Sequence, residues 1–91
     1  GLELVAAGDD PAAALQAFDR ETKASLSRGA EPTTIGGLPA VRASAVARTR
    51  EGPIALDFTW IAYAGQIYRV TGMTRPDALD AMRPVEVYLS P

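Results

Sequence analysis

Residues 33–72 read TTIGGLPAVRASAVARTREGPIALDFTWIAYAGQIYRVTG, and three consecutive runs within them alternate apolar with polar side chains. Turns that contain glycine flank and join these runs, at Gly36-Gly37, Gly52 and Gly65. Alternation of this kind is typical of strands that bury one face, and short glycine turns join antiparallel neighbours. These residues therefore predict an antiparallel β-meander.

The first run, residues 40–50, carries small side chains on the face that we expect to be buried. The odd positions of this face are Val41, Ala43, Ala45 and Ala47. The even positions, which we expect to face water, include Arg42, Ser44, Arg48 and Arg50. Because alanines leave space above the strand, we expect a helix to pack closely there through Leu15 and Phe18.

The second and third runs supply the larger core side chains. One face of the second strand carries Ile54, Leu56, Phe58 and Trp60, which form the best candidate core stripe. Residues 66–72 follow a tight turn at Ala64-Gly65, with Tyr68 and Val70 on one face and Ile67, Arg69 and Thr71 on the other. We expect the three strands to pair as neighbours.

Helices and further strands are predicted around the meander. Asp10 is a good N-cap, Pro11 suits the first helical position and Gly29 suits a C-cap, so a helix is expected from Pro11 to near Arg28. Its expected buried face holds Ala14, Leu15, Phe18, Thr22 and Leu26. A short strand is expected within residues 31–39, a short helix over 76–82 and a final strand over 85–89. The predicted fold class is α+β, an antiparallel β-meander sheet of four to five strands packed by an N-terminal helix and one short C-terminal helix.

Length and composition narrow the class of protein. Ninety-one residues suffice for one domain with one core, and the formal net charge of −2 argues against a nucleic-acid partner. No apolar run approaches the roughly 20 residues that span a bilayer, so no membrane span is expected. The ending Leu89-Ser90-Pro91 resembles a cut, and we expect residues 1–91 to be a single accessory domain of a longer protein.

The residue types for common catalytic sites are missing. The chain has no histidine and no cysteine, so it cannot assemble a Ser-His-Asp or Cys-His arrangement or a typical zinc site. Most carboxylates fall in predicted helix caps or on polar helix faces, where structural roles explain them. We therefore predict no catalytic, cofactor-binding or metal-binding residue in this chain.

A candidate interaction surface comprises Arg42, Arg48, Arg50, Asp57 and Arg69. The arginines form either a solvated strand face or a basic stripe that docks an acidic protein surface. Asp57 interrupts an apolar strand, and we expect it to pair with Arg48 or Arg50 across the sheet. Trp60, Tyr63 and Tyr68 either pack in the core or line a ligand pocket or peptide groove.

The meander also resembles a known family. Residues 37–72 are similar to a segment downstream of the catalytic domain in bacterial envelope zinc metalloproteases that resemble the CAAX prenyl endopeptidases. The similarity rests on Gly37-Leu38-Pro39-Ala40, the turn over residues 49–53, Thr59-Trp60-Ile61 and Ile67-Tyr68-Arg69. Arg83-Pro84 and the run over residues 85–89 are similar to a later strand of that family.

This resemblance implies a non-catalytic accessory domain that positions the protease or binds protein substrates. The zinc-binding HExxH helix is absent, so no catalytic residue carries over, and zinc is expected only in the parent catalytic domain. The implied location is the periplasm or cell envelope. The implied partner is the parent catalytic domain or a protein substrate, and exposed sheet edges make a homodimer by edge-strand pairing conceivable.

Two other functions stay open at this point. One is a stand-alone envelope lipoprotein or small-ligand or protein-binding module, with a pocket over the alanine-rich strand. The other is an enzyme that uses Asp57 with Arg48 or Arg69, although no nucleophile or base of suitable pKa is evident.

Overall fold

The computed structural model describes residues 1–23, 25–74 and 85–88. One α-helix, one short 3₁₀ helix and six strands occur in these ranges. In chain order they are β1 (Leu2–Ala7), α1 (Pro11–Thr22), η1 (Leu26–Gly29), β2 (Glu31–Ile35), β3 (Leu38–Thr49), β4 (Gly52–Tyr63), β5 (Gln66–Thr74) and β6 (Val85–Tyr88).

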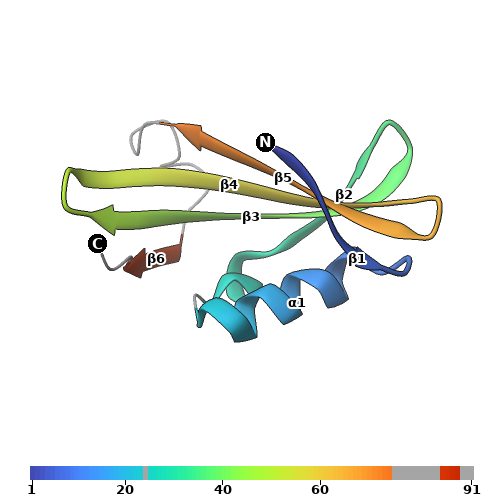
Figure 1. Cartoon of the computed structure of the whole chain (residues 1–91), viewed down its shortest axis with the longest axis horizontal. Coiled ribbons are helices and arrows are strands. Elements are labelled where there is room, and N and C mark those ends of the chain that lie inside the picture. The colour runs from blue at the N-terminus through green and yellow to red at the C-terminus, as the bar shows by residue number, and fades with distance from the viewer. Residues whose placement is uncertain (24, 75–84, 89–91) are drawn as a thin grey trace.

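All six strands belong to one sheet. Five are antiparallel in the order β1-β5-β4-β3-β2, and β6 pairs in parallel with the later part of β3. Helix α1 lies against one face of this sheet (Figure 1). The α+β class and the predicted meander, which corresponds to β3, β4 and β5, are therefore confirmed.

The described strands differ from the sequence prediction in one place. Strand β1 was not predicted, because its pairing is with β5, where Leu2 lies opposite Val70 far along the chain. Among the described residues the antiparallel part of the sheet has five strands, within the predicted four to five, and β6 adds a sixth strand in parallel. The predicted final strand is present as Val85–Tyr88, whereas the predicted helix over residues 76–82 and Leu89 lie outside the described residues.

Helix α1 begins as predicted and ends earlier. Asp10 caps its first turn by accepting a hydrogen bond from the Ala12 amide at 3.1 Å. The helix ends at Thr22 rather than near Arg28, because Lys23 adopts a left-handed conformation with φ 56°. Asp19 then accepts hydrogen bonds from the Leu26 and Ser27 amides, at 2.7 and 3.1 Å, which hold the following chain as η1 instead of further α-helix.

The core lies between α1, η1 and one face of the sheet. The predicted odd positions of β3 are buried, and so are Phe58 and Trp60 of β4, whereas Leu56 is only partly buried. The Phe18 ring centroid lies 5.3 Å from that of Phe58 and 5.6 Å from that of Trp60. Leu15 of the helix belongs to the same buried cluster as Ala43 and Ala45, so the helix packs above the alanine-rich strand as expected.

Candidate functional site

The register of the sheet separates the predicted interaction surface into two faces. Directly opposite residues of paired strands project to the same side of a sheet. Trp60 lies opposite Arg69 and opposite Val41, so Arg69 projects to the α1 side. Arg42 and Asp57 project to the other side, and Arg48 lies on the same face of β3 as Arg42. Arg50 lies in the turn after β3.

Asp57 has a partner other than the predicted ones. Its carboxylate accepts a hydrogen bond from the Arg42 guanidinium at 2.9 Å, and the Ser44 hydroxyl lies 3.5 Å away. The prediction of Arg48 or Arg50 was wrong because Asp57 faces Ser44, which puts Arg42 diagonally across, while Arg48 faces Pro53. Ser44, predicted to face water, is buried beside this pair.

Arg69 lies on the helix side in a different environment. Its Nη2 donates a hydrogen bond to Oε1 of Glu3 at 2.5 Å, and its guanidinium carbon lies 4.3 Å from the centroid of the Phe18 ring. The Arg69 side chain is 17% exposed, whereas that of Glu3 is 57% exposed. The Nε atom is buried and has no hydrogen-bond partner within the part of the chain that the structure describes.

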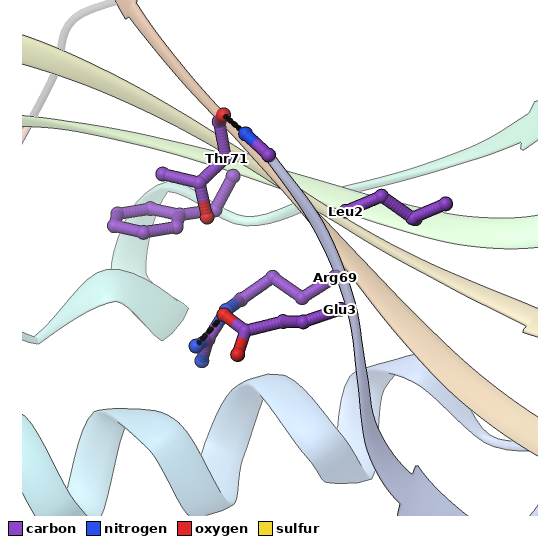
Figure 2. Close-up of a pocket in the computed structure, with 6 residues that line it drawn as sticks. Leu2, Glu3, Arg69 and Thr71 are labelled. Carbon is purple, nitrogen blue, oxygen red and sulfur yellow. Dashed lines mark hydrogen bonds and ion pairs between the residues drawn. The ribbon is translucent and has the colours of Figure 1, made fainter.

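An open cavity of about 470 Å³ lies beside this ion pair (Figure 2). It is lined by Gly1, Leu2, Glu3, Phe58, Arg69 and Thr71. A smaller hollow of about 120 Å³ lies between β1 and α1 and shares Arg69 with the first. These two cavities thus lie beside β1 and α1, whereas the alternative interpretation as a binding module places its pocket over the alanine-rich strand β3.

Sequence reasoning missed this site because it missed β1. Glu3 and Arg69 are directly opposite each other in the pairing of β1 with β5, and that pairing creates the ion pair. The alternation of Leu2, Glu3 and Leu4 is the signal that indicates a strand there.

The face of the sheet away from α1 carries a second feature. Leu2, Leu4, Ile61, Tyr68 and Val70 project from it, and we call this set the open face. Leu4, Tyr68 and Ile61 lie directly opposite one another across three strands. Leu2 is 68% exposed and Leu4 54% exposed. No described helix packs on this face (Figure 1).

Two chemical features are absent from the described ranges. Residues 1–23, 25–74 and 85–88 hold no group of three or more His, Cys, Asp or Glu side chains placed to bind a metal ion. Neither described helix is long and apolar enough to cross a membrane.

No family model, curated protein or solved structure matches this chain. Function is therefore inferred from the geometry of the open face, the geometry of the Arg69 cavity and the sequence resemblance.

Proposed function

We propose that this chain is a non-catalytic accessory domain of an envelope zinc metalloprotease, where it positions the protease or binds its protein substrates. The observation that carries the proposal is the open face. The similarity of residues 37–72 to the segment downstream of such catalytic domains supplies the identity of the partner. In this proposal the zinc belongs to the parent catalytic domain, and the protein resides in the periplasm or cell envelope.

The open face has the character of a protein-binding surface. Its side chains are contiguous across β1, β5 and β4, and contiguous exposed apolar patches mark interaction sites more often than scattered apolar residues do. Tyr68 adds an aromatic ring with a polar end, a combination that is enriched at interfaces. The Arg42–Asp57 ion pair lies on the same face and provides a polar rim.

The complete reading frame tests whether this chain belongs to a protein with a zinc metalloprotease domain. The proposal expects an HExxH sequence upstream of this domain and an export signal at the start of the protein. A reading frame without HExxH would overturn the proposal, because no catalytic domain would then be available for this chain to serve.

Substitution of Val70 tests the role of the open face in the full-length protein. We expect Val70→Lys to reduce cleavage of a protein substrate about tenfold, because a charge would be buried at the contact. Met73→Lys is the matched control, because Met73 is also an exposed apolar residue of β5 but lies opposite Leu56 on the α1 side. Equal cleavage by both variants and the wild-type protein would contradict a role of this face.

A further inference from the structure

We propose that the Arg69 cavity binds a small organic carboxylate that carries an aromatic or branched apolar group. This inference is independent of the metalloprotease proposal, because it rests on the lining of the cavity alone. The site is the one lined by Gly1, Leu2, Glu3, Phe58, Arg69 and Thr71.

Arg69 supplies the side-chain cation of the cavity. A guanidinium has several N–H donors arranged in a planar fork that matches a carboxylate. Within the described residues, the structure gives the Arg69 side chain a single hydrogen-bond acceptor, Oε1 of Glu3. The Nε is enclosed by protein atoms, so the donors available to an anion are the remaining N–H groups of the two terminal nitrogens. Phe18 packs against the guanidinium and fixes its plane beside the cavity. Arg69 is therefore positioned and has donors to spare for an incoming anion.

The apolar part of the ligand has a place beside this charge. Phe58 and Leu2 line the cavity, and Phe58 contacts the aromatic cluster of the core. Thr71 on the same wall supplies a hydroxyl that can donate to a second carboxylate oxygen. The cavity of about 470 Å³ is open, so it has room for a small molecule that stays partly exposed to solvent. The lining thus matches a ligand with one anionic end and one apolar end.

Glu3 competes with this ligand for Arg69. It belongs to β1, which pairs only with β5 in the described sheet, and its side chain is 57% exposed, so water can reach the carboxylate that a ligand would replace. A ligand carboxylate can displace Glu3 and gain the apolar contact as well. Figure 2 shows the Glu3 carboxylate at the guanidinium, where the ligand would have to replace it.

Benzoate is the probe that tests the proposal, with benzamide as its neutral counterpart of similar shape. Trp60 is the sole tryptophan, and its ring centroid lies 5.7 Å from that of Phe58, so its fluorescence reports on the cavity. We expect benzoate to change this emission saturably and to shift the amide NMR signals of Phe58, Arg69 and Thr71. Benzamide should bind at least about tenfold more weakly, because it lacks the charge. No saturable change with benzoate, or equal binding of benzamide, would overturn the proposal.

Three variants distinguish ligand binding from a structural role of Arg69. Arg69→Gln should weaken benzoate binding about tenfold or more, and Glu3→Gln should strengthen it by removing the competing carboxylate. Arg42→Gln is the matched control, because Arg42 is also ion-paired but lies on the opposite face. If Arg69→Gln does not fold, the Glu3→Gln result still decides, and weaker or unchanged binding in that variant would overturn the proposal.

Discussion

At the scale of single residues, Asp19 shows how one side chain determines where a helix ends. Its carboxylate accepts hydrogen bonds from the Leu26 amide and from both the amide and the hydroxyl of Ser27. Partial burial raises the pKa of Asp19, but the hydrogen bonds from Ser27 and the neighbouring backbone lower it by more, so the net pKa lies below the ordinary value of 3.8. The folded protein thus favours the ionised form of Asp19.

The Asp19 contacts predict an acid-dependent loss of stability. Because the folded pKa lies below the unfolded one, the stabilisation is present above the unfolded value of 3.8 and is lost as the pH falls through the folded value. We expect Asp19→Ala to lower the free energy of unfolding by about 1–2 kcal/mol at neutral pH, and by less in acid. Urea unfolding of both proteins at neutral and acidic pH measures this, and a pH-independent difference would contradict it.

The Arg42–Asp57 pair leads to a prediction of small magnitude. Its side chains are 42% and 30% exposed, so water screens the attraction between them. A double-mutant cycle with Arg42→Gln and Asp57→Asn should give a coupling free energy of about 0.2–1 kcal/mol that decreases at high salt. A coupling of several kcal/mol would show that the pair is effectively buried.

At the scale of elements, the turn between β4 and β5 contains a strained residue. Ala64 has a positive φ of 53°, and Gly65 follows with φ 76°. The left-handed region suits glycine and is unfavourable for alanine. The hairpin therefore forms despite an unfavourable residue at its first turn position.

Replacing Ala64 should relieve that strain. We expect Ala64→Gly to raise the free energy of unfolding by about 0.5–1 kcal/mol, whereas Gly65→Ala should lower it by a similar amount. Thermal unfolding of the two variants and the wild-type protein measures both changes in stability, which should have opposite signs. A destabilised Ala64→Gly protein would contradict the turn geometry.

The elements also show which parts of the fold are local enough to predict. Strands β3, β4 and β5 follow one another along the chain, so alternation and glycine turns suffice to predict their pairing. The end of α1 was missed because it depends on a side chain, that of Asp19, bonding residues beyond the helix. Strand β1 was missed because it is stabilised by pairing with β5, where Arg69, the partner of Glu3, lies 66 residues further along the chain.

At the scale of the whole molecule, a single sheet with a helix on one face produces two different surfaces. The α1 side brings Arg69, Glu3 and Phe58 together at the cavity, and the other side presents the open face. The alternation of residues predicted which side chains of β4 and β5 share a face. It did not predict the cavity, because the cavity requires β1 beside β5.

The two surfaces allow the two proposals to fail separately. Partner binding by open-face variants tests the accessory role. Benzoate binding tests the Arg69 cavity, which lies on the opposite face. Pairing of two copies through sheet edges stays a prediction, for which the described edge of β1 is the available strand.

The most direct test of the accessory role is an NMR titration of this chain with the catalytic domain from its own reading frame. We predict saturable amide shifts at Leu4, Ile61, Tyr68 and Val70, with the signals of α1 unchanged, and loss of these shifts in the Val70→Lys variant but not in Met73→Lys. No shifts, or shifts confined to α1, would contradict binding through the open face.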